Sequence, residues 1–292
     1  MKNHLSRRNF LQTAAISASA VMLPSYALAA TKRNKKKDTV IILNKNPLKL
    51  GMMTYTLGRD WDIETIIKNC TETKFQHVEL RTTHAHGVEV TLPAGERAAV
   101  KKRFEDAGLA ISLASGFAYN STDPAQLKKN IDGTKEYVLL ARDVGARGIR
   151  VFGSTTDDEK LLIQIGKALA EVGEFANNNG VEIRVCNDGP TVSMIKKLID
   201  YSQSPYVFVN WNCPMSDLEG EGFESNFNSV KTLIRNIHIR ELWNDYPWRL
   251  FFSLLSQSGY KGYCDAEISG NPDPIRFMKY YRALFLALQD AI

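Results

Sequence analysis

The chain lacks the sequence features of several common protein classes. Only four of its 292 residues are cysteines, and none of them forms a Cys-x-x-Cys pair, so zinc-ribbon and thioredoxin motifs are absent. The first strand-like segment, 49–53, is followed by Thr54-Tyr55-Thr56 rather than by Gly-x-Gly-x-x-Gly, which argues against a dinucleotide-binding fold. No low-complexity stretch or linker after residue 48 indicates a second domain.

Most of the chain also lacks an excess of positive charge. The net charge of +5 comes from the first 38 residues, which hold eight basic side chains and one acidic side chain, or +7. The rest of the chain has 29 basic and 31 acidic side chains, which leaves −2. A nucleic-acid-binding protein needs a basic face to contact phosphates, so we expect no nucleic-acid partner.

The N-terminal region has the pattern of an export signal. Residues 6–11 read SRRNFL, a twin-arginine motif, and an apolar stretch at 14–23 precedes a small-residue cleavage site at 27–30. The apolar stretch is too short to span a bilayer comfortably, which favours a cleaved signal over an uncleaved membrane anchor. We therefore expect a signal peptide at 1–30 and a basic, flexible tail at 31–47. The twin-arginine translocase would be a partner during export, and the mature protein would be periplasmic without a membrane span.

From residue 48 the chain alternates short β-rich segments with amphipathic helical segments. Strands are predicted at 49–53, 76–81, 109–114, 148–152, 181–186, 206–211, 236–240 and 262–268. Helices are predicted at 62–74, 94–107, 124–144, 157–178, 190–201, 225–234, 247–258 and 273–289. Eight such units in about 245 residues have the size of a single (β/α)8 TIM barrel, which we expect over 48–292. The main alternative is a doubly wound open sheet.

Polar residues near the ends of the last two predicted strands indicate a functional site. His238 and Arg240 are two residues apart, so they face the same side of a strand, and Asp265 and Glu267 repeat this arrangement. The active sites of parallel barrels lie at the mouth formed by the C-terminal ends of the strands. The alternative is a set of buried polar groups with internal partners. Their occurrence on successive strands favours a site.

The same alternation places further charged residues inside the barrel. Arg184 would lie deep inside, and we expect it to pair with Asp265, because a buried charge is costly without a partner. Arg81, Arg240 and Arg150 would lie nearer the mouth. Guanidinium groups there suit carboxylates, phosphates and vicinal hydroxyls.

Two cysteines are expected to end adjacent strands. Cys186 and Cys213 would lie close together in an exported protein, so a disulfide between them is conceivable. The two residues are expected to be out of phase with each other, which disfavours the bond.

The segment from about 48 to 290 resembles the xylose-isomerase-like TIM-barrel superfamily. This group contains sugar isomerases and epimerases as well as endonuclease-four-type DNA repair enzymes. The resemblance is carried by HVELR at 77–81, IHIR at 237–240 and AEI at 266–268, on the second, seventh and eighth predicted strands. It is greatest to exported proteins labelled sugar phosphate isomerase/epimerase. It implies an enzyme that moves a proton at a sugar carbon next to a carbonyl.

The resemblance also implies a site for a divalent metal. In such epimerases a Glu, an Asp, a His and a Glu end strands five to eight and hold the metal. The last two match His238 and Glu267 here, but Cys186 and Asn212 stand at the first two positions. Mg²⁺ and Mn²⁺ prefer carboxylate oxygens, and a thiol would favour Zn²⁺. We therefore expect a metal-free site rather than a bound metal, unless Asp188 replaces a missing carboxylate.

The residues and the resemblance together give an expected set of roles. Glu267 is the expected base, Glu79 the second acid or base, and His238 a metal ligand or proton donor. The expected carbohydrate-binding residues are Arg81, Arg240, Asn187, Asn212, Trp211 and Arg150. The alternative function is a non-catalytic periplasmic barrel that binds a sugar with a degenerate metal site. A DNA repair role is disfavoured because the mature chain is not basic.

Overall fold

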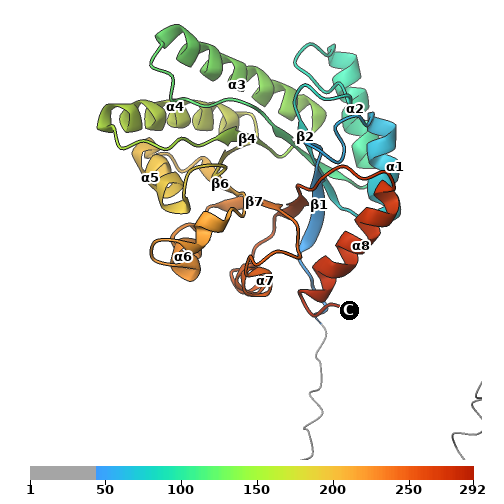
Figure 1. Cartoon of the computed structure of the whole chain (residues 1–292). Helices are drawn as coiled ribbons and strands as arrows, with labels where there is room; N and C mark the ends of the chain where they lie inside the picture. Colours follow the sequence, from blue (N-terminus) through green and yellow to red (C-terminus); the bar gives the residue numbers. More distant parts are fainter. Residues whose placement is uncertain (1–43) are drawn as a thin grey trace, which may run out of the picture. The chain divides into compact units, whose positions relative to one another are not determined.

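The computed structural model describes residues 44–292, so the expected signal peptide and most of the expected tail lie outside the described residues. The described residues form a closed barrel of eight parallel strands in sequence order, each followed by a helix (Figure 1). The first strand pairs with both the second and the eighth, which closes the sheet. The predicted (β/α)8 fold is confirmed, and an open sheet is excluded.

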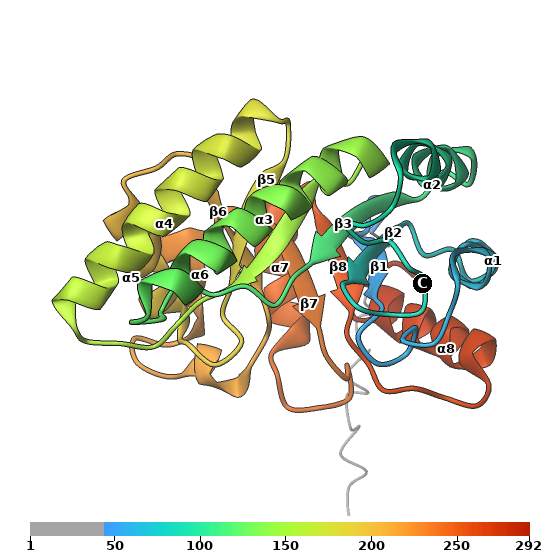
Figure 2. The ribbon, with the colours of Figure 1, turned by 90° about the horizontal axis from the view of Figure 1, so that it is seen from above.

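The strands and helices alternate along the whole described chain. The strands are β1 (Lys49–Met53), β2 (His77–Arg81), β3 (Ala110–Ala114), β4 (Gly148–Phe152), β5 (Glu182–Cys186), β6 (Val207–Trp211), β7 (Ile234–Ile239) and β8 (Tyr263–Ala266). The helices are α1 (Ile63–Thr73), α2 (Ala94–Asp106), α3 (Pro124–Val144), α4 (Glu159–Asn178), α5 (Val192–Ser202), α6 (Phe223–Val230), α7 (Trp248–Gln257) and α8 (Pro274–Ala287). A short 3-10 helix, η1 (Met215–Leu218), precedes α6. Figures 1 and 2 show the helices around the strands, with α8 beside α1.

Local signals account for where most helices begin. The side chains of five residues accept a hydrogen bond from a backbone N–H in the first turn, which satisfies a donor that the helix itself leaves free. These capping residues are Asp62, Asp123, Asp158, Thr191 and Asp273. Gly145 ends α3 with a φ of 77°, a conformation that glycine adopts without steric cost.

The main difference from the predicted elements lies between α6 and β7. The sequence predicts a helix to residue 234, but α6 ends at Val230 and β7 begins at Ile234. Ile234 is buried and pairs with Val209 of β6. Strand pairing therefore determines the structure at a residue whose apolar side chain fits a helix equally well.

The interior of the barrel is polar, whereas branched apolar residues face the helices. Glu79 on β2 contacts His238 on β7, and these strands are not neighbours, so the contact crosses the interior. Gly51 has no side chain because a Cβ there would lie 2.0 Å from Asp265 Oδ1. Barrel interiors are usually filled with branched apolar residues. The charged groups inside this one must therefore find partners among themselves.

The two ends of the described chain lie together. The backbone N–H of Asn44 donates to the carbonyl of Asp290 at 2.7 Å, and Leu48 is buried just before β1. None of the helices within residues 44–292 is long and apolar enough to cross a membrane.

Candidate active site

The part of the barrel interior farther from the mouth holds a carboxylate, that of Asp265, with hydrogen-bonding partners on both oxygens. Asp265 lies 2.7 Å from Nδ1 of His77 and accepts a hydrogen bond of 2.8 Å from Asn236 Nδ2. The expected partner, Arg184, does not reach it. The Arg184 guanidinium instead donates to Glu182, at 3.0 and 2.7 Å, because Glu182 precedes it by two residues on the same strand face. The expected Arg184–Asp265 pair is therefore wrong.

Nearer the mouth a buried ion pair crosses the barrel interior between β2 and β7. Nε2 of His238 contacts Oε2 of Glu79, and Oε1 of Glu79 accepts from Ser112 Oγ at 3.2 Å. Nδ1 of His238 lies 3.0 Å from Oδ1 of Asn212, so both ring nitrogens face acceptors. Burial lowers the pKa of His238, but the Glu79 carboxylate outweighs it and raises this pKa well above its ordinary value. Burial likewise raises the pKa of Glu79, and the His238 imidazolium outweighs it and lowers that pKa.

Glu79 therefore takes a position different from the expected one. It is fully buried, and both of its carboxylate oxygens are engaged by protein groups. A second acid or base has to touch the substrate, whereas Glu79 lies behind His238. Its geometry suits a residue that orients the His238 imidazole and keeps it protonated.

The rim of the mouth carries a carboxylate next to two cations. Glu267 follows β8, and its backbone N–H donates to Ile239 at 2.9 Å. Its Oε2 lies 3.9 Å from His238 Nδ1 and 3.4 Å from Nη1 of Arg240. This oxygen is buried and accepts no hydrogen bond within residues 44–292. Arg240 is more exposed and lies 3.5 Å from Asp188. The structure thus brings His238, Arg240 and Glu267 together at one end of the barrel.

The two asparagines of the expected site are held by the protein itself. Asn187 Oδ1 accepts from the backbone N–H of Asn212 at 2.6 Å, and its Nδ2 donates to Asp217 Oδ1 at 2.9 Å. Nδ2 of Asn212 is buried and has no hydrogen-bond partner within the described residues. Asn212 therefore keeps one donor for a ligand, whereas both polar atoms of Asn187 are used to hold the loop.

Asp217 is a residue of this network that the sequence did not reveal. It lies in η1, is fully buried, and accepts from Tyr246 Oη at 2.7 Å as well as from Asn187. Burial raises its pKa to about 7, although the hydrogen bonds from Tyr246, Trp211 and Asn187 act in the opposite direction. The long irregular loop around it has no periodic pattern that would have predicted this burial.

Trp211, an expected substrate-binding residue, does not face the mouth. Its ring is fully buried between β6 and the neighbouring helices, with its centre 5.4 Å from that of Phe251 and 6.1 Å from that of Phe223. Its Nε1 donates to Tyr246 Oη at 2.9 Å. Because Asn212 faces inward, its neighbour Trp211 must face outward. The expectation that it stacks on a sugar is wrong.

Two arginines on the other side of the mouth have no acidic partner. Arg150 is 4% exposed, and its Nη1 donates to the carbonyl of Ser115 at 2.7 Å. Arg81 is half-buried at the end of β2, and its Nη1 donates to the carbonyl of Thr82 at 3.0 Å. No carboxylate of residues 44–292 lies within the 4.0 Å of an ion pair from either guanidinium.

The four positions that hold a metal in the resembling epimerases do not fit a hard cation here. Cys186 is buried, with its Sγ 3.8 Å from Nδ2 of Asn210, and Asn212 offers a neutral amide. The ring nitrogens of His238 face Glu79 and Asn212. Within residues 44–292 no group of three or more His, Cys, Asp or Glu side chains could hold a metal ion. The donor set lacks the carboxylates that Mg²⁺ or Mn²⁺ prefers.

All four cysteines are buried free thiols. The structure therefore has no disulfide between Cys186 and Cys213. Burial raises the pKa of the Cys213 thiol well above its usual range.

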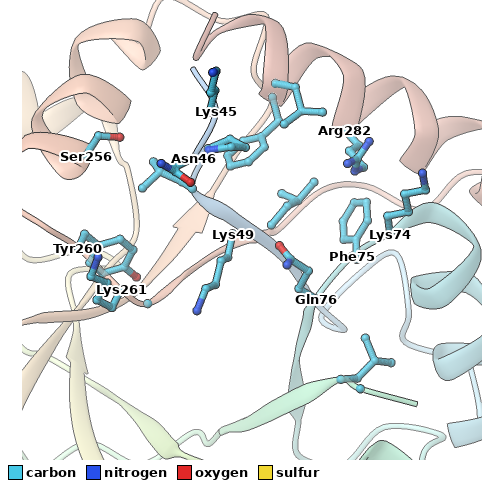
Figure 3. Close-up of a pocket in the computed structure, with 18 of the residues that line it drawn as sticks. Lys45, Asn46, Lys49, Lys74, Phe75, Gln76, Ser256, Tyr260, Lys261 and Arg282 are labelled. Atoms are coloured by element: carbon cyan, nitrogen blue, oxygen red, sulfur yellow. The ribbon is translucent and has the colours of Figure 1, made fainter. Parts of the chain in front are cut away.

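A cavity of about 840 Å³ lies at the opposite end of the barrel, where β1 and β8 begin (Figure 3). Its lining includes Lys45, Lys49, Lys74, Lys261 and Arg282 and no carboxylate. None of the ionisable residues of the mouth lines this cavity. We therefore place the candidate active site at the mouth, where acidic, basic and hydrogen-bonding groups converge.

A (β/α)8 barrel with ionisable side chains at its C-terminal mouth has the architecture of a barrel enzyme. Residues 67–281 match the xylose isomerase-like TIM barrel family, and the chain belongs to this family. No curated protein sequence matches the chain.

Several solved structures share the fold of this chain. An L-ribulose 3-epimerase superimposes with a TM-score of 0.70 at 18% identity, covering 84% of this chain and 95% of its own. A 3-keto-D-glucoside 4-epimerase from E. coli gives 0.68 at 14% identity, covering 82% and 99%. A xylose isomerase domain protein from Planctomyces limnophilus gives 0.65 at 16% identity, covering 85% and 99%. At these identities the similarity establishes the fold alone.

Proposed function

We propose that the protein is a sugar isomerase or epimerase that transfers a proton at a carbon next to a carbonyl. The observation that carries this proposal is the Glu267 carboxylate, which has one buried oxygen free of hydrogen bonds and two cations beside it. A free carboxylate can accept a proton from carbon, and neighbouring cations stabilise the negative oxygen that then develops. The fold of sugar epimerases supports the substrate class.

In the proposed reaction Glu267 removes the proton and the carbonyl oxygen becomes an enediolate oxyanion. The His238 imidazolium, held by Glu79, and the Arg240 guanidinium stabilise this charge. His238 is also the nearest proton donor to Glu267, through its Nδ1–H, which contacts Asn212 in the free protein. Glu267 and His238 lie 3.9 Å apart on the same side of the mouth. In an isomerisation His238 would give a proton to the former carbonyl oxygen and take one from the neighbouring hydroxyl group. Glu267 would return its proton to the carbon that carried this hydroxyl, on the same face, so this arrangement favours isomerisation over inversion.

No step of this proposal uses the metal of the resembling epimerases. Two of the four ligand positions, Cys186 and Asn212, lack a carboxylate, and a buried imidazolium and a guanidinium supply positive charge beside Glu267 instead. Electrostatic stabilisation by fixed cations in a site shielded from water is a large contribution to catalysis.

A second candidate function is sugar binding without turnover. The observation that favours it is the loss of the two carboxylates at Cys186 and Asn212, together with the pairing of Glu267 with Arg240. Under this alternative the mouth holds a sugar through Asn212, Arg240 and the unpaired arginines, and no carbon–hydrogen bond is broken.

Exchange of substrate hydrogen with deuterated water distinguishes the two candidates. We expect NMR to show deuterium entering the carbon next to the carbonyl of at least one ketose or aldose in a panel. The variant Glu267→Gln should lose about 100-fold or more of this exchange. The matched control Glu174→Gln changes an exposed residue of α4 and should leave the rate unchanged. Binding by the wild type without exchange would instead establish the second candidate.

We also propose that the protein is exported by the twin-arginine route and acts in the periplasm. The sequence SRRNFL at 6–11 supports this. Changing Arg7 and Arg8 together to Lys should keep the full-length protein in the cytoplasm in cell fractionation. Unchanged periplasmic recovery would contradict the proposal.

A further inference from the structure

The carboxylates of the mouth form ion pairs with only some of its cationic groups. Glu79 and Glu267 face His238 or Arg240, and Asp188 lies 3.5 Å from Arg240. Two further guanidinium groups, those of Arg81 and Arg150, form no ion pair within residues 44–292. A buried charge without a partner is costly, so such a group is expected to have a role with a ligand.

The guanidinium group of Arg150 is held in a fixed orientation by two contacts with the protein. Its guanidinium carbon lies 4.1 Å from the centre of the Phe152 ring, and its Nη1 donates to the Ser115 carbonyl. Its Nε is buried and has no partner within the described residues. Stacking and one hydrogen bond set the orientation of the guanidinium plane, which leaves a donor for an acceptor that the protein does not supply.

Arg81 adds a second positive charge close to the first. Arg81 is in register with Ala114 of β3, which is in register with Arg150 of β4, so the two arginines lie at one level of the sheet, two strands apart. Burial and the Arg150 guanidinium lower the pKa of Arg81, while Glu89 acts in the opposite direction. Nη2 of Arg81 lies beside Gly116 in the loop after β3. Two cations that repel each other at the mouth are stabilised when an anion binds between them.

The position of these arginines relative to Glu267 defines which part of a ligand they can reach. Arg150 is on β4, whereas Glu267 follows β8, and these strands lie on opposite sides of the eight-stranded ring. A sugar whose reacting carbon lies at Glu267 would therefore direct its far end towards Arg150 and Arg81.

We propose that the substrate is an acidic sugar, with a carboxylate or phosphate at the end remote from the carbonyl, bound by Arg150 and Arg81. This inference rests on the proposed function, because it assumes that the reacting carbon lies at Glu267. It goes beyond that function by assigning the charge of the substrate and the end that carries it.

Matched sugars that differ only at the terminal carbon test the proposal. D-fructose, D-fructuronate and D-fructose 6-phosphate carry a hydroxyl, a carboxylate and a phosphate there. Binding to the wild-type protein is measured by calorimetry, and deuterium exchange by NMR. We expect at least one of the two anions to bind about 10- to 100-fold more tightly than D-fructose, and the better anion identifies the natural group.

The variants Arg150→Gln and Arg81→Gln should reduce this preference to about threefold or less. The control Arg147→Gln removes the same charge from an exposed residue just before β4, at the other end of the barrel, and should keep the full preference. Arg81 is half-exposed, so its variant provides a second test if Arg150→Gln does not fold.

The outcomes separate this inference from the function on which it rests. Equal or weaker binding of both anions by the wild type overturns the inference, as does an unchanged preference in folded Arg150→Gln and Arg81→Gln proteins. Preferred anion binding without deuterium exchange from any sugar supports the anion site and overturns the proposed enzyme. Exchange with D-fructose but not with the two acids leaves the enzyme and overturns the acidic substrate.

Discussion

Replacing Asp217 by Asn should make the protein more stable above pH 7 and leave its stability near pH 4 almost unchanged. The pKa of this carboxyl is raised from 3.8 to about 7 by burial. An acid whose pKa is higher in the folded state keeps its proton when the unfolded chain has lost it. Stability therefore falls as the pH rises from about 4 to 7 and is level above that window. This rise in pKa corresponds to a loss of roughly 4 kcal/mol in the free energy of unfolding between about pH 4 and pH 7.

The Asn variant removes the ionisation while keeping a side chain of the same size. A neutral amide can still accept from Asn187 and contact Tyr246, as the protonated carboxyl does. We expect Asp217→Asn to match the wild type near pH 4 and to exceed it by up to roughly 4 kcal/mol at pH 8.

Urea unfolding followed by tryptophan fluorescence at several pH values measures this difference. The control Asp157→Asn changes an exposed carboxylate before α4 and should follow the wild type at every pH. Parallel stability curves for Asp217→Asn and the wild type would refute the reasoning. A variant that is less stable at pH 8 would show that Asp217 is ionised and held by its hydrogen bonds.

Three other changes test the interior of the barrel. Glu79→Gln should lower the free energy of unfolding by roughly 3 kcal/mol near pH 5, because the His238 imidazolium loses its partner. The loss should be smaller near pH 9, where the ring can be neutral, and urea unfolding at both pH values measures the difference. Trp211→Ala should lower the free energy of unfolding by roughly 3–5 kcal/mol in the same assay. Calorimetry of the folded fraction should show an unchanged sugar affinity, because the ring faces the helices. Gly51→Ala should lower the melting temperature by several degrees, because its Cβ would lie 2.0 Å from Asp265; an unchanged melting temperature would contradict the packing.

The sequence predicted the number and order of the elements well because their signals are local. Asp62 and Asp123 cap helices where the sequence suggests a helix start, and Gly145 ends one. The alternation of side chains along a strand also placed Glu79 and His238 correctly inside the barrel. The same rule predicts that Trp211 faces outward once Asn212 is taken as inward, and the structure has it outward.

The partners of the charged residues could not be predicted in the same way. Glu79 and His238 are 159 residues apart in sequence and meet only because the sheet closes. Arg184 has two carboxylates available on its face of the barrel, and the nearer, Glu182, is its partner. Asp217 lies in irregular backbone, where no period relates sequence to burial. Pairing inside a barrel depends on the depth and reach of side chains, which the sequence pattern does not encode.

The pairing of β1 with β8 has a consequence for the order in which the molecule is made. A ribosome releases β1 early and β8 late, so the first strand has an open edge through most of synthesis. During that time His77 lacks Asp265, and until β7 appears Glu79 lacks His238. An unfinished chain therefore has the Glu79 charge and the polar His77 side chain without partners, in the place where other barrels have an apolar core, and these groups oppose its premature collapse. The polar interior thereby ties stable folding to a complete chain.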